Sequence, residues 1–137
     1  MAHRPHLHVL RLPRLPILQQ LRIEEALLRV DGRNWLILNQ NPPHAPAIVL
    51  GISGDPRKLV NVRAAAEDSV TMIRRFSGGG TVYLDGNTKL VTLIINQDAL
   101  PHLKPFPRTI MSWTELLYRG VFTNPHFAAV ENDYCFG

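Results

Sequence analysis

The sequence lacks the features that mark several classes of protein. Its 137 residues include one cysteine, so an intrachain disulfide framework is excluded. No apolar run approaches the roughly 20 residues that a membrane-spanning helix needs, and we expect no membrane partner. Charged residues make up only 19% of the chain and hydrophobic residues 45%, which argues against disorder.

The charge balance is basic but does not identify a partner. Lysine and arginine together number 15 against 11 acidic residues, for a formal net charge of +4. Such a balance favours polyanions in general, whether nucleic acid, nucleotide or acidic protein. Aromatic residues are scarce, at 7%, and do not alternate with the basic ones as in single-strand-binding surfaces. We therefore predict no nucleic-acid partner.

The first 23 residues allow two interpretations. They contain four arginines, three histidines and no acidic residue, as do mitochondrial transit peptides. They also contain three prolines and no serine, which transit peptides do not favour. The alternative, which we prefer, is a strand near 8–12 followed by a bend at Pro13 and Pro16.

Hydrophobic spacing predicts helices at 17–30, 61–68 and 109–119. In the first helix, we expect Leu18, Leu21 and Leu28 to form the apolar stripe, with Glu25 on its edge. Strands are predicted at 35–38, 47–52, 71–76, 81–84, 90–96 and 127–133. We interpret 41–46 as a loop and 54–56 as a turn.

These elements predict one α+β domain over residues 1–137. Helices and strands mix without strict βαβ alternation, which favours a mixed, largely antiparallel sheet flanked by helices. The chain shows no internal repeat and no linker. Because it stops shortly after the last predicted strand, we expect that strand either to be a docked edge or to belong to a longer domain.

The glycine-rich segment 74–82 carries the densest chemical signal. Three consecutive glycines, Gly78–Gly80, expose backbone amides that can form an anion-binding nest. Arg74 and Arg75 precede them and should point to opposite faces of a strand, so at most one should reach a ligand in the loop. The segment matches neither a P-loop nor G-x-G-x-x-G. The alternative is a surface hairpin with two exposed arginines.

Several motifs together resemble one family. The run Arg-Arg-x-Ser-Gly-Gly-Gly-x-Val-x-x-Asp at 74–85 is similar to the signature loop of lipoate–protein ligases, in the biotin/lipoate ligase catalytic-domain superfamily. The helix with Glu24-Glu25, the segment 48–53 and the pair Asn132-Asp133 resemble other family motifs in the same order. The hallmark of biotin ligases, Gly-Arg-Gly-Arg-x-Gly, is missing.

The resemblance implies a fold and an activity. Family members use ATP and magnesium to activate lipoate or octanoate as an acyl-adenylate. The acyl group then passes to a lysine of lipoyl-domain acceptor proteins of 2-oxoacid dehydrogenases, or of the glycine-cleavage H-type protein. The nucleotide-binding role would fall to Arg75, Gly80, Thr81, Val82 and Tyr83. The acyl and adenylate role would fall to Arg74, Gly78, Gly79, Asn132 and Asp133.

Two departures from the family pattern stand out. Leu84 occupies the place of the usual histidine, and leucine cannot form that histidine's hydrogen bonds. The catalytic lysine of the family follows Asn-Asp by about ten residues, whereas only four residues follow Asp133 here. The three lysines present, Lys58, Lys89 and Lys104, lie elsewhere. The resemblance therefore implies a domain that is incomplete at its C-terminus, is inactive alone and has no catalytic residue of its own; a non-catalytic binding module is the alternative.

Other candidates have weaker support. Cys135 is a possible nucleophile for octanoyl or lipoyl transfer, but no His–Asp pair neighbours it in the sequence. His3, His6 and His8 have strand-like spacing, yet we predict no metal site. Lipoylated acceptors would place the protein in mitochondria or plastids, and otherwise in the cytoplasm.

Overall fold

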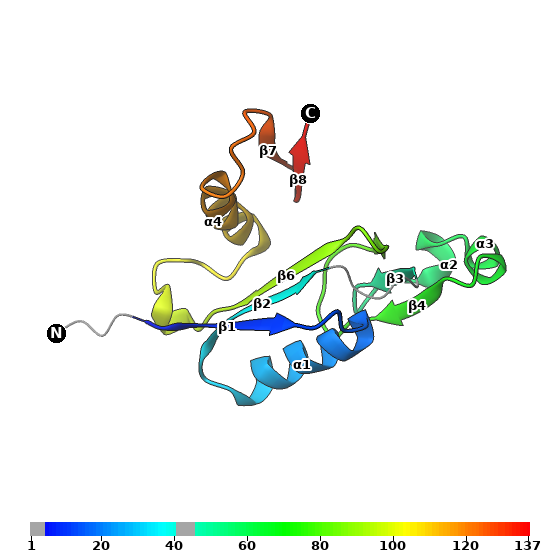
Figure 1. Ribbon diagram of the computed structural model, residues 1–137, viewed down its shortest axis with the longest axis horizontal. Helices are drawn as coiled ribbons and strands as arrows, with labels where there is room; N and C mark the ends of the chain where they lie inside the picture. The colour runs from blue at the N-terminus through cyan, green and yellow to red at the C-terminus, as the bar shows by residue number, and fades with distance from the viewer. Residues whose placement is uncertain (1–4, 41–45) are drawn as a thin grey trace. The chain divides into compact units, whose positions relative to one another are not determined.

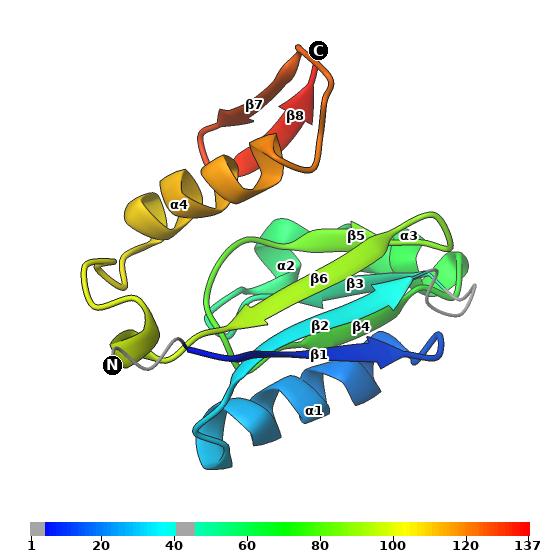
Figure 2. The same ribbon diagram turned by 60° about the vertical axis from the view of Figure 1, so that its left-hand side comes forward.

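The protein is described from a computed structural model, which describes residues 5–40 and 46–137. Figures 1 and 2 show its helices and strands. The chain forms two compact units, Met1–Ile95 and Asn96–Gly137, and each is described by itself. The loop predicted at 41–46 lies, except for Pro46, outside the described residues, as does His3.

The first unit contains two three-stranded sheets. In one, β1 (Leu7–Leu12) pairs in parallel with β2 (Asn34–Gln40), which pairs antiparallel with β6 (Lys89–Ile94). In the other, β3 (Ala47–Leu50) lies between β4 (Thr71–Arg74), which is parallel to it, and β5 (Val82–Leu84), which is antiparallel. The mixed pairing confirms the predicted α+β class. The strand at 7–12 agrees with the preferred interpretation of the N-terminal segment.

Helix α1 (Ile17–Val30) has the predicted bounds but a different buried face. It lies along one face of the β1–β2–β6 sheet (Figure 2). Leu18 and Leu28 are 42% and 56% exposed, so the stripe predicted through them is wrong. Its buried residues are Gln20, Leu21 and Glu24. Leu21 packs with Val49 of β3 and Leu84 of β5 in the core of this unit.

Two short helices, α2 (Pro56–Leu59) and α3 (Val62–Glu67), connect β3 to β4. The turn predicted at 54–56 is instead the start of α2. Asp55 caps that helix by accepting a hydrogen bond from the backbone N–H of Arg57. Proline suits the first position of a helix, occupied here by Pro56, because a backbone N–H at that position would have no partner within the helix. An Asp-Pro pair is a sequence signal for the start of a helix.

The second unit consists of η1 (Gln97–Ala99), α4 (Pro107–Arg119) and a hairpin of β7 (Phe127–Val130) with β8 (Asp133–Phe136). The single strand predicted at 127–133 is therefore wrong. Glu131 takes a left-handed conformation, with φ of 56°, and with Asn132 turns the chain between the two strands. The unit's core is a cluster of aromatic rings around Phe127, which is 3% exposed.

Candidate functional site

The glycine loop is held against the end of β3. The backbone N–H of Arg75 donates to the carbonyl of Leu50 at 2.9 Å, and that of Ile52 donates to the carbonyl of Ser77 at 2.9 Å. A Cβ at Gly51 would lie 2.2 Å from the carbonyl oxygen of Gly79, so only glycine fits there. Gly79 has φ of +101°, a conformation that other residues rarely adopt. The loop is therefore a built part of the fold.

Arg75 folds back onto this loop. Its Nε and Nη2 donate to the carbonyl of Gly78 at 3.1 and 2.8 Å, and Nη2 also donates to the carbonyl of Gly80 at 2.9 Å. Its Nη1 makes no hydrogen bond to the described residues. Arg75 is half-buried, and its guanidinium both shapes the loop and leaves the two N–H groups of Nη1 without a partner among the described residues.

Arg74 points elsewhere, as strand alternation predicted. Its Nη1 donates to the carbonyls of Gly51, Ile52 and Gly54 at 3.3, 3.0 and 2.6 Å. The two arginines therefore hold two different segments, 51–54 and 78–80. Together they fix the backbone on both sides of the close approach between Gly51 and Gly79.

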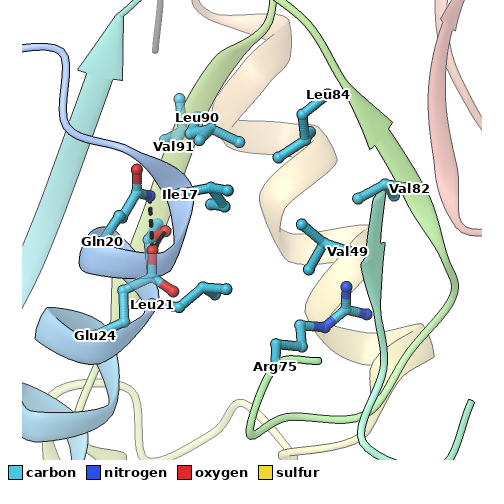
Figure 3. Close-up of a pocket in the computed structure, with 11 residues that line it drawn as sticks. Ile17, Gln20, Leu21, Glu24, Val49, Arg75, Val82, Leu84, Leu90 and Val91 are labelled. Carbon is cyan, nitrogen blue, oxygen red and sulfur yellow. Dashed lines mark hydrogen bonds between the residues drawn. The ribbon is translucent and has the colours of Figure 1, made fainter. Parts of the chain in front are cut away.

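Beside the loop lies an open pocket of about 140 Å³. The figure shows Arg75 across the pocket from Gln20 and Glu24 of α1 (Figure 3). Most of the lining is apolar: Ile17, Leu21, Val49, Val82, Leu84, Leu90 and Val91. Among the lining residues that the structure describes, Arg75 is the one cation and Glu24 the one carboxylate. Such a pocket suits an apolar chain that ends in an anionic group.

The α1 side of the pocket is a hydrogen-bonded network. Glu24 Oε1 accepts from Gln20 Nε2 at 2.7 Å and from Thr92 Oγ1 at 2.6 Å. Asn39 Nδ2 donates to Gln20 Oε1 at 2.9 Å and to the carbonyl of Leu15 at 2.8 Å. Gln20 and Asn39 are 1% and 0% exposed, and Glu24 is 9% exposed. Because buried polar groups are costly to leave unpaired, this network fixes the α1 wall of the pocket.

Sequence comparison identifies the family. The family described as the lipoyl protein ligase A/B catalytic domain matches residues 16–137, which is nearly the whole chain. The chain belongs to this family.

Two curated proteins are similar to this chain in sequence. The inactive lipoate–protein ligase 2 of Plasmodium falciparum is 27% identical over 120 residues, covering 72% of this chain and 31% of that protein. The mitochondrial lipoyl amidotransferase LIPT1 of Homo sapiens is 30% identical over 100 residues, covering 69% of this chain and 26% of that protein. The chain thus spans about a third or less of the length of these relatives.

Solved structures share the fold of this chain. P. falciparum LipL1, in complex with lipoate, matches 96% of this chain and 41% of its own, with a TM-score of 0.66 and 21% identity. Protein Ta0514 of T. acidophilum, with bound lipoic acid, matches 97% of this chain and 58% of its own, with a TM-score of 0.62 and 17% identity. These likenesses confirm the fold predicted from the family resemblance.

The structure brings together part of the predicted site. Arg75 and Val82 line the pocket, and Gly78–Gly80 contact Arg75 or lie beside it. Thr81 follows the loop with its Oγ1 buried and unpartnered among the described residues. The side chain of Tyr83, the next residue but one, is 60% exposed.

Arg74 is not among the lining residues of this pocket, and two other predicted residues belong to the second unit. Arg74 braces segment 51–54, and Asn132 and Asp133 lie in the hairpin of the second unit. Leu84, the departure from the family pattern, is buried and lines the pocket among other apolar side chains. Leu84 therefore contributes apolar packing to the pocket wall.

Four residues of the site were not predicted from the sequence. Three of them line the pocket, Gln20, Glu24 and Thr92, and the fourth, Gly51, contacts the glycine loop. Helical spacing does not choose between the two acids, because Glu24 is seven residues after Ile17 and Glu25 is four residues after Leu21. In the structure Glu25 instead pairs with Arg29 at 2.8 Å on the outer face, as its i,i+4 spacing allows. Nothing in the sequence alone connects Thr92 to Glu24.

The structure adds no support to the lesser candidates. Cys135 is exposed on β8. Within residues 5–40 and 46–137, no group of three or more histidine, cysteine or acidic side chains is placed to hold a metal ion. None of the helices in the described part of the chain has the length and apolarity to cross a membrane.

Proposed function

We propose that this lipoyl ligase domain binds lipoate or octanoate together with ATP and forms an acyl-adenylate. The acyl group would then pass to a lysine of a lipoyl-domain acceptor protein, of the 2-oxoacid dehydrogenase or glycine-cleavage H type. Family membership supports the general class of this activity. The observation that carries the proposal is the pocket in which apolar walls meet Arg75 beside the glycine loop.

The chemistry of the pocket suits this reaction. Attack of a carboxylate on the α-phosphate brings two anions together, and cationic and N–H groups must offset their repulsion. Arg75, whose Nη1 is unengaged, would contact the phosphate. The backbone at Gly80 and the three residues after it would line the nucleotide, as the family resemblance implies.

The acyl end would lie along the apolar walls. Gly78 and Gly79 would approach the new acyl–phosphate bond, with Arg74 holding the neighbouring segment 51–54 in place. Asn132 and Asp133 keep the acyl-site role that the family resemblance gives them. Magnesium would arrive as the ATP complex, since Mg²⁺ usually binds through substrate phosphates and a few carboxylates. A mitochondrial or plastid location belongs to the same proposal.

The test compares Arg75→Ala with Arg63→Ala. Arg63 is also an arginine of the first unit, but its side chain is exposed and pairs with Glu67 at 2.8 Å. We expect Arg75→Ala to weaken binding of an acyl-adenylate analogue by about 1.5–3 kcal/mol, the range of a charge-assisted hydrogen bond. Arg63→Ala should leave it unchanged. Calorimetric titration measures both, and equal affinities for the two variants would contradict the assignment.

A second candidate is a binding module without ligase activity. Similarity to the inactive lipoate–protein ligase 2 of Plasmodium falciparum, at 27% identity over 120 residues, favours this candidate. Such a module would bind nucleotide weakly and transfer little or no acyl group. Mass spectrometry of an acceptor domain incubated with the chain, ATP, magnesium and lipoate tests this; rapid acyl transfer would exclude the second candidate.

A further inference from the structure

The second unit carries a groove that the proposed function does not use. We call it the α4 groove. Its apolar half is a hollow of about 370 Å³ between the loop residues Leu100 and Leu103 and the side chain of Trp113 on α4. The adjoining half, about 650 Å³, shares Leu103 and Trp113 and extends past Lys104 and Arg108. The groove lies wholly within residues 99–116.

The walls of the α4 groove are fixed by hydrogen bonds. Gln97 Nε2 donates to the carbonyls of Leu100 and Leu103 at 3.0 and 2.9 Å, which holds the loop wall in one conformation. Thr109 Oγ1 donates to the carbonyl of Lys104 at 2.6 Å and so joins the other end of the loop to the first turn of α4. Pro105 and Pro107 further restrict this connection. A partner would therefore meet a preformed surface with little ordering to impose.

The charge of the α4 groove has one sign. No carboxylate occurs among the described residues that line it. Lys104 and Arg108 are exposed, and neither side chain forms an ion pair with the described residues. Further along the same helix, by contrast, Arg119 pairs with Glu115 at 2.5 Å. The cations of the groove are thus available to an external anion, beside Leu116, which is 71% exposed.

We propose that the α4 groove docks an acidic segment of a partner protein, with one apolar side chain inserted between Leu103 and Trp113. The carboxylates of that segment would pair with Lys104 and Arg108. Charge complementarity supports this occupant, because the cations border an apolar hollow that a purely ionic ligand would leave unfilled. The inference requires neither nucleotide nor acyl chemistry and is independent of the proposed function.

Two other occupants fit the groove less well. Single-stranded nucleic acid is usually held by several stacking aromatic rings, whereas Trp113 is the only aromatic among the lining residues of the α4 groove other than the imidazole of His102. A second copy docking groove to groove would bring Lys104 and Arg108 against the same cations of its partner, which is unfavourable.

The test uses the full chain and a short fluorescein-labelled peptide in which two leucines stand beside four glutamates. Two variants carry the same change in net charge: Lys104→Glu with Arg108→Glu in the groove, and Arg22→Glu with Lys58→Glu on exposed positions of α1 and α2. Fluorescence anisotropy measures the affinity. We expect the groove variant to lose about ten-fold or more in affinity, and the matched variant to lose less than about two-fold.

The apolar contact has its own readout. In a Trp35→Phe background, Trp113 is the single tryptophan, and its emission should shift to the blue when the peptide binds. Replacing the peptide's leucines with serines should remove that shift and weaken binding. Equal losses in the two charge variants would overturn the proposal, as would tighter binding of an oligonucleotide or a dimer that only the groove variant abolishes.

Discussion

The pocket of the first unit and the α4 groove of the second differ in how they relate to the hydrophobic core. The first unit contains eight of the nine buried apolar residues in the described ranges. Three of these core residues, Leu21, Val49 and Leu84, also line its pocket. In the second, Phe127 is the one buried apolar residue, and the α4 groove lies away from it on an exposed helix and loop. Mutations should therefore couple stability to binding in the first unit and separate them in the second.

The largest effect is expected from Phe127→Ala. The ring lies 5.2, 5.6 and 5.4 Å from those of Phe122, Tyr134 and Phe136, so its removal leaves a cavity in the small core of the second unit. Deletions of this kind destabilise proteins by about 3–5 kcal/mol.

Each unit has its own reporter for this experiment, because the chain has two tryptophans, Trp35 and Trp113. In single-tryptophan backgrounds, Phe127→Ala should shift the denaturation midpoint seen by Trp113 more than that seen by Trp35. Phe106→Ala, which removes a ring that is 62% exposed, is the matched control and should shift neither. Equal shifts at both reporters would mean that the units unfold as one.

The next effect is expected from Gly51→Ala. The added Cβ would lie 2.2 Å from the carbonyl oxygen of Gly79, and because that contact is with backbone, β3 and the glycine loop must separate. Overpacking costs about 1–3 kcal/mol, and we expect the upper end together with loss of ligand binding at the pocket. Gly32→Ala adds a Cβ into open space and is the control. Chemical denaturation and calorimetric titration would show both losses; a stable variant that binds normally would contradict the coupling.

A smaller effect on stability is expected from Gly79→Val. A β-branched residue disfavours φ of +101°, and its Cβ would lie 2.7 Å from Arg75 Nη2. Strain of this kind costs about 1–3 kcal/mol. Since the guanidinium can move, we expect the fold to survive at the lower end of that range while ligand affinity falls further. Gly80→Val, where φ is not positive and no atom lies near, should cost less stability; the reverse order in thermal denaturation would rule out this reading of the loop.

The smallest effect concerns an exposed pair outside the pocket. The guanidinium of Arg33 hydrogen-bonds Asp31 and holds the pKa of that carboxyl well below its usual range. A depressed pKa in the folded state adds stability that is fully present well above the unfolded pKa of about 3.9 and is lost progressively as the pH falls from there through the folded-state pKa. Asp31→Asn should therefore lower the urea midpoint slightly at neutral pH, and by less and less as the pH is lowered below about 4. Asp98→Asn, which removes an exposed carboxylate without an ion pair, should show no such dependence on pH.

The sequence predicted the bounds of α1 better than it predicted which face of that helix is buried. The bounds of α1 agree with the structure, yet the stripe assigned through Leu18 and Leu28 is wrong. Gln20 and Glu24 are buried because Asn39 and Thr92 supply hydrogen bonds from neighbouring strands, and no hydrophobic scale anticipates such partners. Because these hydrogen-bond partners lie on other strands, the α1 wall of the pocket could not be predicted from the sequence of the helix.

By itself, the sequence determined the family and the glycine loop, since both rest on residues close together in the chain. The run from Arg74 to Asp85 carries the resemblance, and alternation along a strand already separated Arg74 from Arg75. Only the tertiary structure decided that Gly51 must be glycine, that Glu24 rather than Glu25 faces the pocket, and that Lys104 and Arg108 border an apolar hollow. The first two depend on contacts between segments that are far apart in the chain, and the third depends on how the loop before α4 folds back onto that helix; neither kind of packing leaves a local sequence pattern.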